Sequence, residues 1–314
     1  MKLFHVLTLL STIALAPFSA LPAAAQTEGG DSPSLTKKLN AYVGCINRLS
    51  ERSHQSRDRY FSWASKKGPT GKERIIYGTY TIYDTRDCRK NVEMANALDP
   101  RDAELEAAAT AYSEAVATLE PLLKEADDYY TQEDYRDDKM AKGKALHPRL
   151  VAAWDAFAKA DTSLRNGVDS IRDKLALQRL AEIEQKEGRK ARYHIEALMI
   201  EAKAVLGAVN QPKPDLAALT KAVASYEAIV KATEEISGDA PDTKVGSMFI
   251  SDAKSLLTTS KQLMRRIRDK VPYSTGDKMI LNSGGGGWMV EGSPPRLLRD
   301  YNQLINAYNR GARI

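Results

Sequence analysis

The chain has 314 residues, of which 46 are Lys or Arg and 41 are Asp or Glu, so its formal net charge is +5. Charged residues make up 28% of the sequence, and both signs are interspersed along it. This composition favours solubility and argues against dedicated nucleic-acid binding, because nucleic-acid-binding proteins usually concentrate basic residues on one face.

The N-terminus has the pattern of a secretory signal sequence. Lys2 supplies the positive start, residues 6–16 form the apolar run, and residues 23–25 are three alanines that match a cleavage site. We expect cleavage of residues 1–25, which leaves a mature chain of 289 residues with a net charge of +4 in the periplasm or outside the cell. The apolar run is too short to span a bilayer, and no Cys for lipidation precedes Cys45.

Apolar residues recur every three or four positions through most of the mature chain. These repeats cover residues 35–49, 105–130, 146–175, 195–209 and 216–233. The spacing predicts an all-α fold, an elongated antiparallel helical bundle with long heptad-like helices. We expect helix starts at Ser32-Pro33, Asp99-Pro100 and Ser293-Pro294, where a capping side chain precedes a proline. The domain prediction is one helical-bundle domain over residues 26–314, which can divide into subdomains 26–210 and 211–314.

Cys45 and Cys88 are the two cysteines of the chain. Export places them in an oxidising compartment, so we expect a disulfide between them. Because they are not in a CxxC arrangement, a structural role is favoured over a redox role, and closing a loop of this length stabilises by about 4 kcal/mol.

No segment carries a specific catalytic or metal-binding motif. The histidines of the mature chain, His54, His147 and His194, lack the paired spacing of a helical zinc site. Residues 68–73 (GPTGKE) lack the spacing and the hydroxyl residue of a phosphate-binding loop, and no GxSxG motif occurs. We therefore predict no catalytic residue, no metal and no cofactor.

The most unusual local composition is residues 125–144 (EADDYYTQEDYRDDKMAKGK), with seven acidic residues and three tyrosines. One interpretation is a site for a cation or cationic ligand built from Asp134, Asp137 and Asp138. The other, which we favour, is a solvated turn, because the alternating ligands of a calcium loop are missing and acids at a helix start are stabilised by the dipole. The candidate ligand-binding residues in and after the turn are Tyr130, Asp134, Tyr135, Asp137, Asp138, Lys139, Lys144 and His147.

Three further segments have alternative interpretations. The aromatic residues Tyr60, Trp63 and their neighbours up to Tyr83 can stack on sugar rings, although a minicore under a loop is favoured. The basic residues Lys254, Lys261, Arg265 and Arg268 share one helical face. That face can bind anionic lipid or wall polymer, but pairing with acids of a neighbouring helix is commoner. Residues 284–287 (GGGG) precede Trp288 and Met289, which either form an apolar tip or dock into the core.

Several segments resemble the YiiG-like family of bacterial envelope proteins of unknown function. They are residues 60–63, 68–74, 125–130, 134–139 and 142–148, and the resemblance covers most of the mature chain. The resemblance implies a helical fold and an envelope location, and it supplies no activity. Members are often lipoproteins, whereas this chain lacks the anchoring cysteine.

These observations favour a non-enzymatic exported envelope protein that binds a partner protein or a cell-wall polymer through its helix ends and turns. Long helices that bury their apolar stripes against one another leave few concave sites for catalysis. The alternative is a protein that binds a small ligand or a metal, with hydrolysis as a further option, at a site near Asp134 to His147.

Overall fold

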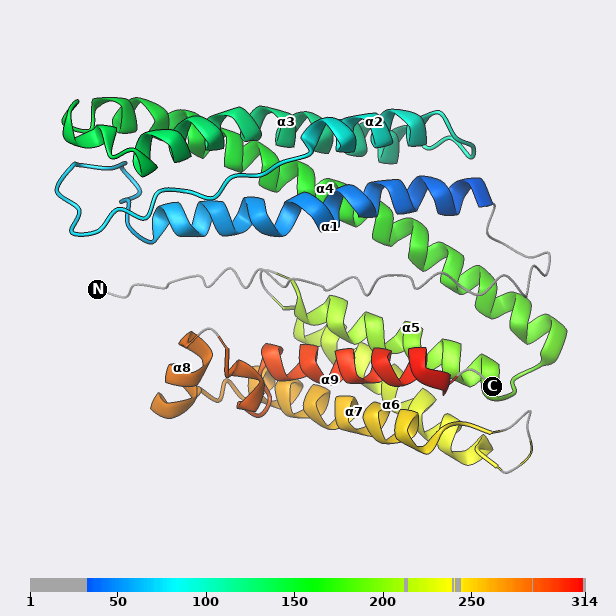
Figure 1. Ribbon diagram of the computed structural model, residues 1–314. Helices are drawn as coiled ribbons and strands as arrows, with labels where there is room; N and C mark the ends of the chain where they lie inside the picture. Colours follow the sequence, from blue (N-terminus) through cyan, green and yellow to red (C-terminus); the bar gives the residue numbers. More distant parts are fainter. Residues whose placement is uncertain (1–32, 212–213, 239, 241–243, 284, 313–314) are drawn as a thin grey trace. The chain divides into compact units, whose positions relative to one another are not determined.

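The computed structural model describes residues 33–312, apart from residues 212–213, 239, 241–243 and 284 (Figure 1). The expected signal sequence, residues 1–25, and the expected helix cap Ser32 lie outside the described residues. The described chain folds into α-helices with short 3₁₀ and π segments, and no β-strand occurs in it, which confirms the all-α helical bundle. It divides into two compact units within one long helix, between Lys174 and Leu175.

The N-terminal unit contains the helices that carry the Tyr-rich turn. They are α1 (Pro33–Phe61), α2 (Thr85–Asn96), α3 (Ala103–Thr131), the 3₁₀ turn η1 (Asp134–Arg136) and the part of α4 (Ala141–Glu187) that ends at Lys174. The start of α3 differs from the prediction at Asp99-Pro100. Asp102 caps the helix instead, because its side chain accepts a hydrogen bond from the Leu105 amide at 3.0 Å.

The core of this unit is built from the predicted apolar stripes. The fully buried side chains at 3–4 spacing include Tyr42, Ile46 and Leu49 of α1, Tyr112, Val116, Leu119 and Leu123 of α3, and Leu150, Trp154, Phe157 and Leu164 of α4. Short helix α2 packs on α1 and α3. The Cys45–Cys88 disulfide is present, with 5.2 Å between the Cα atoms, and it ties α2 to α1.

The C-terminal unit contains the rest of α4 and five further helices. These are α5 (Ala191–Val209), α6 (Leu216–Ile236), α7 (Ser247–Arg268), α8 (Thr275–Asn282) and α9 (Pro294–Ala307), with the 3₁₀ turn η2 (Gly287–Met289) before α9 and the π segment η3 (Tyr308–Ala312) after it. The predicted helix start at Ser293-Pro294 is confirmed, since the Ser293 side chain accepts a hydrogen bond from the Arg296 amide.

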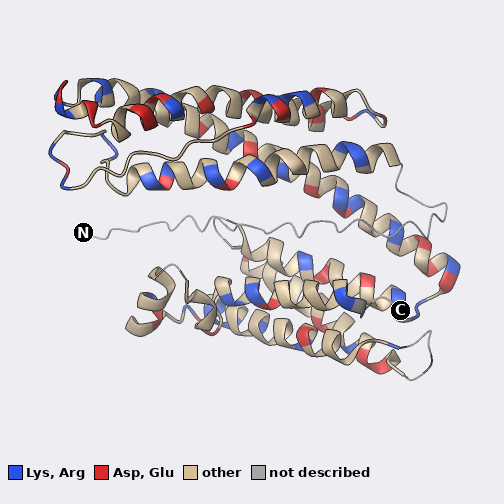
Figure 2. Cartoon of the chain, in the orientation of Figure 1, with Lys and Arg blue, Asp and Glu red and all other residues tan. Residues whose placement is uncertain are grey.

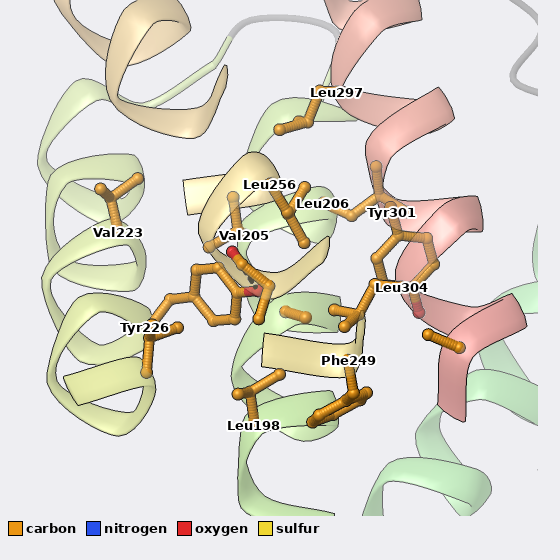
Figure 3. Packing of buried hydrophobic residues seen from close by; sticks show 14 of the residues in the cluster. Leu198, Val205, Leu206, Val223, Tyr226, Phe249, Leu256, Leu297, Tyr301 and Leu304 are labelled. Carbon is orange, nitrogen blue, oxygen red and sulfur yellow. Dashed lines mark hydrogen bonds between the residues drawn. The ribbon is translucent and has the colours of Figure 1, made fainter. Parts of the chain in front are cut away.

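One apolar cluster joins the helices α5, α6, α7 and α9 (Figure 3). Tyr226 of α6 reaches into it and donates a hydrogen bond to the Ala253 carbonyl of α7 at 3.0 Å, so its buried hydroxyl is satisfied. Phe249 of α7 and Leu304 of α9 belong to the same cluster and are fully buried. This packing leaves α8 outside the cluster, and no residue of α8 is buried.

Charged side chains of both signs are distributed along the helices of both units (Figure 2). No described helix has the length and apolar character that crossing a membrane requires.

Candidate functional site

Asp138, one of the candidate acidic ligands, caps helix α4. Its carboxylate accepts hydrogen bonds from the backbone amides of Ala141 at 3.1 Å and Lys142 at 2.8 Å, and from the Tyr129 hydroxyl at 2.8 Å. Desolvation opposes ionisation of Asp138, but these hydrogen bonds outweigh it and lower the pKa of the carboxyl group. The same pairing and the burial of the phenol raise the pKa of Tyr129 to about 12. The lone pairs of Asp138 are therefore engaged in holding the turn.

The other candidate residues of the acidic turn are more open. The side chains of Asp137, Lys139 and Lys144 are exposed, while those of Asp134 and Tyr135 are half-buried. Tyr135 packs on Tyr129 and Tyr130, with ring centroids 6.4 and 6.5 Å apart. Among the residues that the structure describes, no group of three or more His, Cys, Asp or Glu side chains has a metal-binding arrangement.

His147 and Tyr60 form a hydrogen-bonded pair beside this turn. The Tyr60 hydroxyl lies 2.9 Å from His147 Nδ1, and His147 Nε2 lies 3.3 Å from the Lys66 carbonyl oxygen. Because a carbonyl only accepts, Nε2 is the donor in the contact with Lys66. Tyr60 is fully buried, and burial raises its pKa to about 12.

Trp63 and Tyr130 complete this aromatic cluster. Trp63 Nε1 donates to the Gly78 carbonyl at 2.9 Å, and its ring meets Tyr130 edge-on at 5.0 Å and Tyr60 edge-on at 5.2 Å. Gly78 has φ +66° and sits against Tyr130, so its backbone approaches the ring closely. These rings pack edge to face on one another, which is the arrangement of a minicore under the loop.

Among the tyrosines of the following loop, Tyr80 is covered by neighbouring side chains. Arg52 and Arg59 place their guanidinium carbons 3.7 and 4.4 Å from the centroid of the Tyr80 ring. Such cation–π contacts occupy the ring that a sugar would need. Tyr77 and Tyr83 remain largely exposed, at 48% and 66%.

The basic face of α7 is paired with acids of α6 and of its own C-terminus. Lys254 contacts Glu234 at 2.6 Å, Lys261 contacts Glu227 at 2.6 Å, and Arg268 contacts Asp269 at 2.8 Å, while Arg265 is exposed. These ion pairs neutralise most of the basic face of α7, which was a candidate for binding anionic lipid.

A buried polar network lies in the core of the N-terminal unit, where no site was expected from the sequence. Asp161 of α4 is 5% exposed and accepts hydrogen bonds from Ser50 at 2.6 Å, from Arg165 at 3.0 Å and, through Oδ2, from His54 at 3.1 Å. The Ser50 hydroxyl also lies 2.8 Å from the Tyr112 hydroxyl. Burial opposes ionisation of Asp161, but its three partners outweigh that effect and lower the pKa of the carboxyl group. Ser50 bonds to Asp161 and not to His54, so the network is not a nucleophile–base pair.

A groove of about 860 Å³ runs between α3 and α4 of the N-terminal unit. Its walls are mainly small side chains, which include Ala108, Ala111 and Ala115 of α3 and Ala153, Ala156, Ala160, Ser163 and Gly167 of α4. Acidic side chains, Glu104 and Glu114, line it on α3, whereas Lys159 and Lys174 line it on α4. The groove thus has walls of small side chains of mixed polarity, with acidic residues on α3 and basic residues on α4.

The family model described as "Protein of unknown function (DUF3829)" matches residues 33–310. The chain belongs to this family. The protein printed as "Uncharacterized protein YiiG" from Escherichia coli (strain K12) is 38% identical to it over 277 residues, which are 87% of this chain and 78% of the relative. These matches confirm the resemblance to the YiiG-like family. No solved structure matches the chain.

In this member of the DUF3829 family, the structure brings Tyr60, Trp63, Tyr130, Tyr135 and His147 into one aromatic cluster, with Asp138 at its edge through Tyr129. It leaves Asp137, Lys139 and Lys144 exposed. The groove was missed from the sequence, although alanines at 3–4 spacing on both helices were its visible signal.

Proposed function

We propose that this chain is an exported partner-binding protein, and that the groove between α3 and α4 docks an amphipathic helix of another envelope protein. The observation that carries the proposal is the groove itself, a channel of about 860 Å³ walled by small side chains with charges of opposite sign on its two edges. Helices commonly bind in apolar grooves through side chains at 3–4 spacing.

The shape of the groove favours a helix with large apolar side chains. Ala111 and Ala156 are exposed, and Ala108 and Ala115 are half-buried, so the floor and walls are open to a partner. Small side chains let another backbone approach closely and leave space for Leu, Ile or Phe. A second copy of the chain would present the same small residues and would leave much of this space unfilled.

The charges on the two edges of the groove indicate which charges a partner helix would carry. Helices α3 and α4 are antiparallel, since Leu105 lies at Gly167 and Tyr112 contacts Phe157. In this antiparallel alignment, Glu114 and Lys159 lie at similar positions along the helix axes, on opposite edges of the groove. Neither side chain makes an ion pair within the described chain. A partner helix with basic residues along one edge and acidic residues along the other would therefore complement both.

Two features support a location outside the cytoplasm. Residues 1–25 have the pattern of a signal sequence, and the Cys45–Cys88 disulfide suits an oxidising compartment. A protein that binds the chain at that location would be another protein of the cell envelope.

Binding of a small ligand near Asp134 to His147 is supported less well. Asp138 caps α4, His147 bonds to Tyr60 and to the Lys66 carbonyl, and the aromatic rings pack on each other. These side chains already satisfy one another, so a ligand would have to displace native contacts.

In-cell photo-crosslinking tests the groove. A photoreactive phenylalanine at position 111 should form an adduct with one envelope protein, whereas the same residue at the exposed position Lys124 of α3, outside the groove, should not. The crosslinked peptide should come from a helix with large apolar residues at 3–4 spacing and charged edges of opposite sign. An adduct only with a second copy of this chain, or no adduct, would refute the proposal.

A binding measurement on the captured segment completes this test. A synthetic peptide of that segment should bind the purified mature chain, and Ala156→Trp, which fills the groove, should weaken binding at least about tenfold. Glu114→Lys should weaken it by a smaller factor that shrinks at high salt. Lys124→Trp is the matched control and should bind normally. Equal affinity for the Ala156→Trp variant would show that the peptide binds elsewhere.

A further inference from the structure

Helix α8 of the C-terminal unit is a short amphipathic helix that packs on the turn η2 through the half-buried Ile280 and Leu281 but has no fully buried face. It has eight residues, and none of them is buried. Its start is well defined, because Ser274 and Asp277 form a reciprocal capping box. So short a helix gains little from its own backbone hydrogen bonds and normally depends on packing. An exposed apolar face on it therefore points to a surface that covers it.

Large apolar side chains gather around α8 and the turn η2. Met279 is 70% exposed, Met289 52%, Val271 50% and Trp288 42%. The elements that carry them are in contact: helix α8 packs on η2, and a Cβ added to Gly286 would lie 2.8 Å from Met289 Cε and 3.1 Å from Ile280 Cγ2. We call these four exposed residues the apolar tip. Soluble proteins rarely expose such a group of apolar side chains unless it binds something.

The apolar tip is held in place by arginines from α7 and α9. Arg266 of α7 donates to the Pro272 and Glu291 carbonyls, each at 3.2 Å, and lies over the Tyr273 ring at 4.4 Å. Arg299 of α9 lies over the Trp288 ring at 4.4 Å. These contacts connect the segment around residue 271 with the turn around residue 290. The tip is thus a fixed part of the fold that presents its apolar side chains outward.

The charges around the tip favour an anionic partner. Lys270 and Lys278 are exposed and make no ion pair within the described part of the chain. Of the acids nearby, Asp277 caps α8, Asp269 pairs with Arg268, and Glu291 is exposed. Unpaired basic side chains beside an exposed Trp and two Met side chains form the combination that interfacial helices use on anionic membranes.

We propose that the apolar tip docks on the headgroup region of an anionic lipid leaflet, with Trp288, Met279 and Met289 partly inserted and Lys270 and Lys278 on the lipid phosphates. The contact is peripheral, since it uses a short helix and a turn that lie on the membrane surface. It is separate from the groove of the N-terminal unit and requires no partner protein.

Vesicle binding tests this proposal with the purified mature chain. The chain should co-sediment with vesicles that contain phosphatidylglycerol, much less with pure phosphatidylcholine vesicles, and the binding should weaken as salt rises. Bromine-labelled lipid should quench the fluorescence of the wild type and not that of Trp288→Phe. No binding to anionic vesicles, or quenching that is independent of Trp288, would overturn the proposal.

Matched variants separate the tip from other exposed apolar residues. The triple change Met279→Ser, Trp288→Ser, Met289→Ser should reduce vesicle affinity at least about tenfold, because it removes the inserting side chains. Leu177→Ser, which changes a 55% exposed residue of α4, should bind like the wild type. Ala156→Trp should also leave vesicle binding unchanged, so this experiment and the groove experiment can fail independently. Equal vesicle affinity for the triple variant would refute the docking surface.

Discussion

Replacement of Asp161 by Asn tests the buried polar network of the N-terminal unit. The substitution keeps the size of the side chain and removes its charge. The wild-type carboxylate is 5% exposed and accepts from Ser50 at 2.6 Å, His54 at 3.1 Å and Arg165 at 3.0 Å. An Asn amide offers one oxygen, so its NH₂ group must face a donor. At least one of the three donors then loses its partner.

The expected loss of unfolding free energy is about 3 kcal/mol. Hydrogen bonds to charged groups contribute about 1.5–3 kcal/mol, and removal of one member of a buried charged pair costs roughly 3–5 kcal/mol. We take the lower end of the range for a buried charged pair, because the Arg165 side chain is 30% exposed and can be solvated after the change. For a unit of this size the loss corresponds to a fall of roughly 10 °C in the Tm.

Urea unfolding followed by tryptophan fluorescence measures this loss. Trp63 and Trp154 report on the N-terminal unit, and a Trp288→Phe background removes the signal of the C-terminal unit. The pKa of Asp161 is lower in the folded protein than in the unfolded chain. The contribution of Asp161 to the unfolding free energy is therefore present above the pKa of an unfolded Asp, near 4, and is lost as the pH falls below that value. The difference between wild type and variant should therefore shrink in acid.

Asp155→Asn is the matched control on the same helix. Asp155 pairs with Arg57 at 2.8 Å, but its side chain is 60% exposed, so its loss should change the unfolding free energy by less than about 1 kcal/mol. If Asp161→Asn unfolds at the same urea concentration as this control, the network does not stabilise the fold and the reasoning is wrong.

Three further changes test other parts of the chain. Replacing Cys45 and Cys88 by Ser should lower the unfolding free energy by about 4 kcal/mol, since the disulfide spans 43 residues, and reduction of the wild type should reproduce the loss in the same urea titration. Gly68→Ala should destabilise by about 1–3 kcal/mol in thermal unfolding, because φ is +105° and the new Cβ would lie 3.1 Å from an imidazole carbon, whereas Gly188→Ala, with φ +77° and open space, should cost less. Asp138→Ala should destabilise the start of α4 at neutral pH, and since the pKa of Asp138 is lowered, hydrogen exchange of the first α4 amides should show the effect fade in acid.

The candidate site shows where prediction from the sequence reaches its limit. The clustering of Tyr60 with Trp63 was expected, since they are close in sequence, but the contact of Tyr60 with His147 joins residues 87 positions apart. The role of Asp138 as a helix cap depends on local backbone geometry, and a cap next to a helix start is a common arrangement. Its pairing with Tyr129 required the turn to fold back on α3.

The helices, their approximate extents and the disulfide were determined by the sequence itself. A 3–4 repeat of apolar residues is a local property of the chain, and two cysteines in an oxidising space have one intramolecular pairing available. Only the tertiary structure decided which apolar helix faces pack against each other. Ser50 and Asp161 are 111 positions apart, the alanine stripes of α3 and α4 became a groove, and α8 was left without a buried face. The physical reason is that a periodic pattern shows which face of a helix is apolar, whereas the partner of that face is chosen by the packing of all the helices together.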